Sequence, residues 1–289
     1  MKRSGVSNLV LTSPWLVTLL LFWAFPVAYS LYASFTDFQL LQGEYNWIGL
    51  GNYRELLQDE DFLAALKNTA IFVLGTIPVT TVLSLILALL ISRHIKGRTF
   101  FRSAFFIPSI TSMVVIALVF TQLLSREGYI PLLARTIGLS PPINGLLYSD
   151  STALYSIMAM DVWMSMGYYM LIWLAGLKSI PTELYEAAEI SGASRLRTFF
   201  SITLPLLRPV ALFIVVVNSI KSFQVFVEIF VMTKGSFDTL TTVYFIYEQG
   251  LTTAFRIGYA SAAAYILLLI IGAFSLLQFR LLRLRQSIW

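Results

Sequence analysis

The sequence predicts an all-α membrane protein with six transmembrane helices. Of its 289 residues, 57% are hydrophobic and only 12% are charged, and the mean hydropathy is +0.78. Soluble domains carry about 25% charged residues, so this composition excludes an ordinary soluble enzyme, a disordered chain and a coiled coil. The sequence has no succession of short segments with alternating polarity, the pattern typical of membrane barrels. Lipid is therefore the predicted solvent for most of the chain.

Apolar runs long enough to cross a bilayer occur six times. A hydrocarbon core about 30 Å thick requires about 20 predominantly apolar residues in a helix. Four of the runs contain no charged residue, one contains Asp161, and one contains Lys221 and Glu228. The first run exceeds the roughly 7–15 apolar residues of a signal peptide, so we expect it to be retained. The predicted spans are 9–35, 69–92, 103–124, 153–176, 209–232 and 258–279.

The distribution of Lys and Arg indicates that both termini are cytoplasmic. Loops on the cytoplasmic side of a membrane protein are enriched in these residues. With six spans, the side that holds both termini carries thirteen of the 20 basic residues and three of the 15 acidic residues. The opposite side carries six basic and ten acidic residues. The net charge of +5 is thus a topology signal, and we expect no binding to nucleic acid.

The cytoplasmic segment 178–208 is predicted to form two short helices joined by a sharp corner. Thr182 is a suitable N-cap for the first helix. Gly192 suits the left-handed position that ends this helix. Ser194 is expected to cap the second helix, which should stop before Pro205 because proline disfavours helix in the preceding residue.

Glu186, Ala187 and Ala188, followed by Gly192 and the ending Leu204-Pro205, resemble the EAA loop of permease subunits of ATP-binding-cassette (ABC) importers. Both alanines are too small to fill a groove, so they let another surface approach the helix. Ser191 departs from the family pattern, which usually has Asp before the glycine. Four further segments resemble the carbohydrate-uptake branch of the family: WIGLGNY at 47–53, FFIP at 105–108, SFQVF at 222–226 and GYASA at 258–262.

The resemblance implies the type I ABC importer permease fold, in the plasma (inner) membrane of a bacterium or archaeon. It implies a subunit that forms half of a sugar translocation pathway. The implied partners are two ATPase subunits, a second permease, expected to be a paralogue, and an extracytoplasmic sugar-binding protein. The EAA loop at 178–208 would seat in a cleft of an ATPase subunit. The implied coupling residues are Glu186, Ala187, Ala188, Gly192, Ala193, Leu204 and Pro205.

The sequence also predicts a chain without catalytic residues or a cofactor of its own. It contains no G-x-x-x-x-G-K-[ST] phosphate loop, so ATP and Mg²⁺ would be bound by the ATPase partner. There is no cysteine and His94 is the only histidine, which argues against a metal site and against an activated serine nucleophile. A membrane enzyme is therefore discounted.

Polar residues within the predicted spans are candidates for the substrate pathway. Ionisable residues at membrane depth are costly and normally face a cavity or a bundle interior. Lys221 and Glu228 lie seven residues apart on one face of the predicted fifth helix, together with Asn218 and Gln224. The fourth span adds aromatic rings that suit the C–H faces of a sugar. The candidate residues are Asp161, Trp163, Tyr168, Asn218, Lys221, Gln224 and Glu228.

Other interpretations of these residues remain open. Asp161 is able to form a structural ion pair with Lys221, and Trp163 and Trp173 are equally compatible with packing or with an aromatic belt. A second functional hypothesis is an ion-coupled carrier that acts alone, with Asp161 and Glu228 as a proton relay. The sequence does not identify the solute: saccharides, polyols and glycerol phosphates are all compatible with it.

Overall fold

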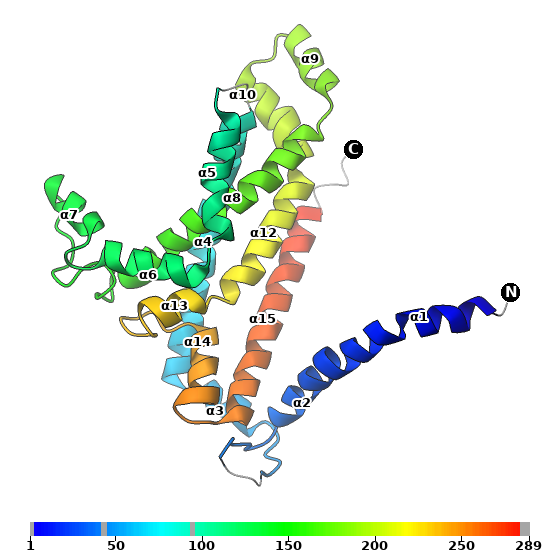
Figure 1. Ribbon diagram of the computed structural model, residues 1–289, viewed down its shortest axis with the longest axis vertical. Coiled ribbons are helices and arrows are strands. Elements are labelled where there is room, and N and C mark those ends of the chain that lie inside the picture. Colours follow the sequence, from blue (N-terminus) through cyan, green and yellow to red (C-terminus); the bar gives the residue numbers. More distant parts are fainter. Residues whose placement is uncertain (1–2, 42–44, 93–95, 284–289) are drawn as a thin grey trace. The chain divides into compact units, whose positions relative to one another are not determined.

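The computed structural model describes residues 3–41, 45–92 and 96–283, which are mostly helical (Figure 1). Within these ranges there is no strand, and only two isolated β-bridges occur, at Thr36–Trp47 and Ser125–Gly145. The predicted all-α class is confirmed. The chain divides into two compact units, 1–63 with 245–268 (unit 1) and 64–244 with 269–289 (unit 2).

Unit 1 contains the first apolar segment and a polar network beside the start of the last helix. Arg256 donates to Glu55 over 2.7 Å and lies 4.0 Å from the centre of the Tyr259 ring. The hydrogen bond to Glu55 raises the pKa of the Arg256 guanidinium. Tyr259 in turn donates to Asp59 over 2.5 Å. The helices wholly in this unit are α1 (Arg3–Leu19), η1 (Leu20–Ala24), α2 (Phe25–Ala33), α3 (Gly51–Leu56) and η3 (Glu248–Thr252).

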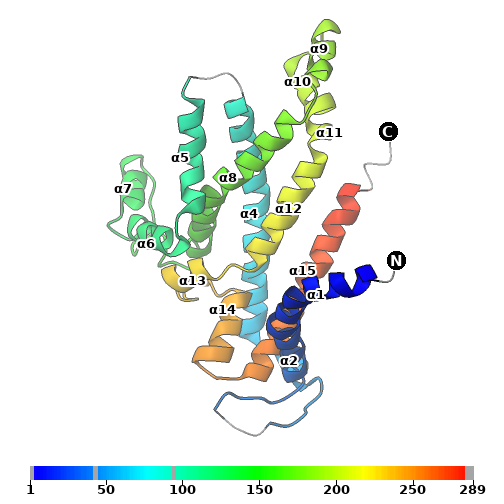
Figure 2. The same cartoon turned by 45° about the vertical axis from the view of Figure 1, so that its right-hand side comes forward.

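Unit 2 is built around α8 (Ala153–Lys178), which lies between α5 (Arg98–Ile110) and α12 (Arg208–Phe223) (Figure 2). Helix α5 approaches α8 closely at Gly167, where an added Cβ would overlap the carbonyl oxygen of Phe105. The other helices wholly in this unit are α6 (Met113–Leu124), α7 (Tyr129–Thr136), α9 (Thr182–Ile190), α10 (Arg195–Thr198), η2 (Phe199–Thr203), α11 (Leu204–Leu206) and α13 (Val227–Met232). Helices α4 (Glu60–Ser92), α14 (Thr242–Tyr247) and α15 (Ile257–Arg283) have residues in both units.

Four helical segments of the described ranges are long and apolar enough to cross a membrane: Leu11–Ala33, Glu60–Ser92, Ala153–Lys178 and Ile257–Leu281. Two bent helix pairs also qualify if each pair is counted as one span. The pair Arg98–Ile110 and Met113–Leu124 bends by 97°, and the pair Arg195–Leu206 and Arg208–Phe223 bends by 63°. The described part of the chain therefore holds four to six candidate spans.

Two of the predicted spans are not continuous helices. In the third, 103–124, Thr111 and Ser112 leave helical geometry, with ψ angles of 150° and 126°. Pro108 lacks the N–H group that would continue the helical ladder, and the Thr111 N–H closes the last turn on the Pro108 carbonyl over 3.2 Å. The bend thus follows from a weakened last turn of α5.

The fifth predicted span, 209–232, is interrupted after Phe223, and the chain becomes helical again at Val227. The amides of Gln224 and Val225 close α12 with bonds to residues three positions earlier. The carbonyl of Val225, which α12 no longer uses, accepts a hydrogen bond from Thr241 Oγ1 over 3.2 Å. A buried backbone carbonyl needs such a partner, so the break is stabilised by a contact distant in sequence.

Candidate functional site

The loop between α8 and α12 forms a sharp corner at Gly192. Gly192 has a φ of +71°, a left-handed conformation that glycine adopts without strain. Its amide donates to the Glu189 carbonyl over 3.0 Å, and the Ala193 amide donates to the Ala188 carbonyl over 2.9 Å. This pair of bonds is a Schellman motif. The predicted role of Gly192 in ending the first helix is confirmed.

The capping predictions for this loop have mixed outcomes. The Ser194 hydroxyl accepts the amide of Arg197 over 3.3 Å, so its predicted N-cap role is confirmed. Thr182 is not the cap of α9, because the helix already includes it and Pro181 occupies the cap position. The second helix also does not stop before Pro205. The π-helical η2 is followed by α11, and a proline fits the first turn of a helical segment because its missing N–H is not needed there.

The corner exposes several of the predicted coupling residues and a set of apolar side chains. Glu186, Ala187 and Gly192 are exposed, whereas Ala188 is buried against the rest of unit 2. Ala193, Leu204 and Pro205 are partly exposed. Large exposed apolar side chains on the segment 178–208 are Leu184, Ile190, Leu196, Phe200 and Leu206, of which Ile190 is 88% exposed.

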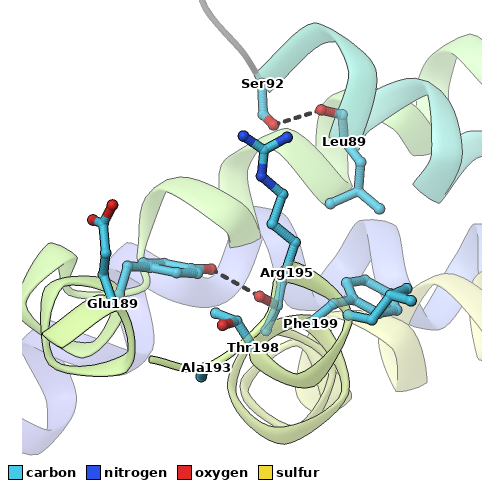
Figure 3. Close-up of a pocket in the computed structure, with 10 residues that line it drawn as sticks. Leu89, Ser92, Glu189, Ala193, Arg195, Thr198 and Phe199 are labelled. Carbon is cyan, nitrogen blue, oxygen red and sulfur yellow. Dashed lines mark hydrogen bonds between the residues drawn. The ribbon is translucent and has the colours of Figure 1, made fainter. Parts of the chain in front are cut away.

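A cavity of about 910 Å³, the loop pocket, lies beneath the corner (Figure 3). The side chain of Arg195 extends across it toward Ser92 and the last turn of α4. A cation near the C-terminus of a helix interacts favourably with the helix dipole. The residues that line the loop pocket are Leu89, Ser92, Tyr185, Glu189, Ala193, Arg195, Leu196, Thr198, Phe199 and Thr203.

A second cavity, the membrane pocket, of about 290 Å³, lies among the predicted spans of unit 2. It includes Tyr168 and Lys221, two of the predicted pathway residues. The tyrosine ring and the polar side chains offer the aromatic surface and hydrogen-bonding groups that a sugar requires. The lining residues are Ser109, Met113, Met164, Ser165, Tyr168, Tyr169, Val217 and Lys221.

Lys221 forms an ion pair at the edge of the membrane pocket. Its Nζ lies 2.8 Å from Asp161 Oδ1 and donates to Ser165 Oγ over 2.6 Å. Asp161 is 2% exposed, whereas the Lys221 side chain is 41% exposed. The predicted ion pair between these two residues is confirmed. Lys221 also lines the membrane pocket.

The remaining predicted pathway residues do not line the membrane pocket. The ring of Trp163 packs 5.3 Å from that of Phe120. Asn218 is fully buried, and no partner of its side-chain amide occurs among the described residues. Trp173 is buried and donates to Ser84 over 3.1 Å, so its packing interpretation is confirmed.

The predicted stripe on the fifth span is wrong. Lys221 lies in the last turn of α12, Gln224 follows the end of that helix, and Glu228 lies in the first turn of α13. Because the chain leaves helical geometry at 224–226, residues seven apart no longer share a face. Glu228 is buried but does not line the pocket with Lys221.

Sequence reasoning did not identify Ser109, Met113, Met164 or Ser165. Ser165 is one turn after Asp161, so helical spacing contained the signal for it. Ser109 bridges two helices, because its hydroxyl donates to the Met164 carbonyl over 2.7 Å and accepts the Tyr168 amide over 3.1 Å. No local pattern marks that pairing of α5 with α8. Among the described residues, no three metal-binding side chains cluster; His94 lies outside the described ranges.

Bent, partly interrupted apolar helices surround a pocket that includes Tyr168 and Lys221, an arrangement typical of membrane transport proteins. Residues 80–286 match the family described as the binding-protein-dependent transport system inner membrane component. The chain belongs to this family, and it is accordingly a multi-pass inner-membrane protein. The similarity to ABC permeases inferred from the EAA segment is confirmed.

Similar proteins include two permeases of Bacillus subtilis (strain 168). The chain is 34% identical to the probable ABC transporter permease protein YesP, over 96% of this chain and 91% of that protein. It is 33% identical to the arabinooligosaccharides transport system permease protein AraP, over 93% and 86%. A subunit of a bacterial alginate ABC transporter, solved with an alginate pentasaccharide-bound periplasmic protein, matches with a TM-score of 0.85 and 23% identity, covering 99% of this chain and 96% of that one. This similarity shows that the chain has the fold of an ABC transporter permease.

Proposed function

We propose that this chain is the permease subunit of an ATP-driven sugar importer and forms half of its translocation pathway. The observation that carries the proposal is the rigid corner at Gly192, with exposed Glu186 and Ala187 and the apolar Ile190 beside it. Such a surface fits a cleft in an ATPase subunit. The corner would transmit closure of two ATPases to the helices that carry the membrane pocket.

The proposed topology has six spans, with both bent helix pairs counted, and cytoplasmic termini. The segment 178–208 then lies in the cytoplasm, where ATP is available, as the excess of Lys and Arg on that side requires. The chain itself binds no nucleotide and catalyses no reaction. Its other proposed partners are a second permease, expected to be a paralogue, and an extracytoplasmic sugar-binding protein.

A saccharide is the proposed solute. Relatives are named for arabinooligosaccharides, for multiple sugars in Streptococcus mutans and for lactose in Rhizobium radiobacter. The membrane pocket combines the Tyr168 ring with hydroxyl and ammonium groups. In the proposed pathway Tyr168 and Lys221 contact the solute, and Asp161 orients the ammonium group of Lys221.

The alternative, an ion-coupled carrier that acts alone, is weakened by the ion pair. A proton relay through Asp161 needs a carboxylate that faces the pathway, but this side chain is 2% exposed and lies 2.8 Å from the Nζ of Lys221. Glu228, the second relay candidate, lies on another helix.

Purification from the native membrane and reconstitution test the proposal. We expect two ATPase subunits and a second permease to co-purify with this chain. Proteoliposomes with the complete complex should accumulate sugar only when binding protein is outside and ATP inside. Uptake by this polypeptide alone, driven by a pH gradient, would contradict the proposal and support the carrier.

A further inference from the structure

Helix α9 is joined to η2 by a hydrogen bond between Tyr185 and Thr203. The two hydroxyl groups are 3.1 Å apart, and Figure 3 draws the bond as a dashed line at the loop pocket. Among the described residues, no other side-chain hydrogen bond connects α9 with η2. Thr203 is only 5% exposed, and both residues line the loop pocket.

The ring of Tyr185 is anchored in the apolar core of unit 2. It packs against a cluster that includes Trp173, Leu207 and Ile214. The same cluster contains Tyr169, a lining residue of the membrane pocket. One side chain therefore contacts both the core beneath the corner and the polypeptide that leads to α12.

Thr203 is well placed to transmit a displacement. It ends the π-helical η2, which α11 and then α12 follow after a bend of 63°. Helix α12 carries Lys221 to the membrane pocket. Single π-helical turns are frequent at functional sites. The loop pocket leaves about 910 Å³ of open space beside this bond, so packing across that space cannot replace it.

We infer that Tyr185 is a positioning residue that makes α9 and η2 move as one body. The inference rests on the proposed function, since it assumes that α9 is displaced by an ATPase. The Tyr185–Thr203 hydrogen bond converts a shift of α9 into a shift of η2 and α12. Without it, α9 tilts into the loop pocket, and ATP is hydrolysed with less transport.

The test compares sugar taken up per ATP hydrolysed in the reconstituted complex. Tyr185→Phe keeps the ring and removes the hydroxyl, and Thr203→Val removes the partner hydroxyl. Each variant should still co-purify with the ATPase, and uptake per ATP should fall about fivefold, as expected when one net hydrogen bond is lost. The double variant should be no worse than either single variant, because both changes remove the same bond.

Two controls separate this bond from a general loss of stability. Thr203→Ser retains a hydroxyl group, so its uptake per ATP should equal that of the unmodified protein, in contrast to Thr203→Val. Tyr155→Phe makes the same chemical change at an exposed position of α8 and should leave uptake per ATP unchanged. Unchanged uptake per ATP in Tyr185→Phe would overturn the inference, as would loss of ATPase binding in a folded Tyr185→Phe protein.

Cross-linking tests joint movement directly, because the chain has no cysteine. A Tyr185→Cys, Thr203→Cys protein should transport poorly until a short bifunctional maleimide joins the two positions, and uptake per ATP should then recover. Failure to recover in a cross-linked, assembled complex would show that α9 and η2 must separate and would overturn the inference. Failure of the unmodified chain to bind an ATPase would instead contradict the proposed function.

Discussion

Lys221 on α12 contacts two residues one turn apart on α8, Asp161 over 2.8 Å and Ser165 over 2.6 Å. These contacts join the two helices at the membrane pocket. The carboxylate compensates the ammonium charge, while 41% of the Lys221 side chain stays exposed. The pocket therefore presents a cation whose cost at membrane depth is reduced by a buried partner.

Removal of Lys221 should destabilise the protein more than removal of the whole pair. Lys221→Met leaves the buried Asp161 without its cation, and because the Lys221 side chain is 41% exposed the expected cost is about 1–3 kcal/mol, below that of a fully buried pair. Lys221→Met combined with Asp161→Asn removes both charges and should recover most of that stability. Thermal unfolding of the purified protein in detergent measures the difference.

Lys178→Met is the matched control, since Lys178 is exposed at the end of α8 and forms no ion pair among the described residues. It should shift the unfolding temperature little. A Lys221→Met protein as stable as the unmodified one would show that the ion pair contributes nothing.

The all-α class and the helix corner were predictable because they depend on local chemistry. Apolar runs of bilayer length indicate helices surrounded by lipid. Only glycine adopts the φ of +71° at Gly192 without strain. The breaks at Thr111 and Gln224 were not predictable from apolar length alone. The second break depends on Thr241, sixteen residues from the Val225 carbonyl to which it donates.

The candidate pathway was only partly predictable for the same reason. Tyr168 and Lys221 were identified, and the ion pair with Asp161 was one of the open interpretations. The stripe through Gln224 and Glu228 assumed a continuous helix that does not exist. Ser109 was missed because its contribution depends on how α5 packs against α8, which no periodicity in the sequence contains.

Gly167→Ala should destabilise unit 2. The added Cβ would overlap the Phe105 carbonyl oxygen, a backbone atom that cannot rotate away. Overpacking of this kind costs about 1–3 kcal/mol. Gly272→Ala is the matched control, because nothing lies within 4 Å of its added Cβ and alanine favours helix by about 1 kcal/mol over glycine. The unfolding temperature should therefore fall for Gly167→Ala and rise for Gly272→Ala. Equal shifts in the two variants would contradict the close approach at Gly167.

Gly192→Val should prevent association with the ATPase while leaving membrane insertion intact. The position has open space around it, so the expected effect comes from the backbone. A β-branched residue with a φ of +71° is strained by about 1–3 kcal/mol, and relief of that strain changes the angle between α9 and α10. Gly192→Asn tolerates the left-handed conformation and should retain the partner. Normal ATPase co-purification and uptake with Gly192→Val would contradict the coupling role of the corner.

Ile190 and Leu139, two exposed positions, should lie on opposite sides of the membrane, and labelling of single cysteines placed there tests this. Because the chain has no cysteine, each variant offers one thiol to a membrane-impermeant maleimide. Ile190, 88% exposed, lies on the proposed cytoplasmic corner, and Leu139, 60% exposed, lies in the loop after α7. Leu139→Cys should be labelled in intact cells, and Ile190→Cys only in inside-out vesicles. Labelling of Ile190→Cys from outside would show that the corner is extracytoplasmic. An ATPase in the cytoplasm could not bind it there, and the proposed function would be contradicted.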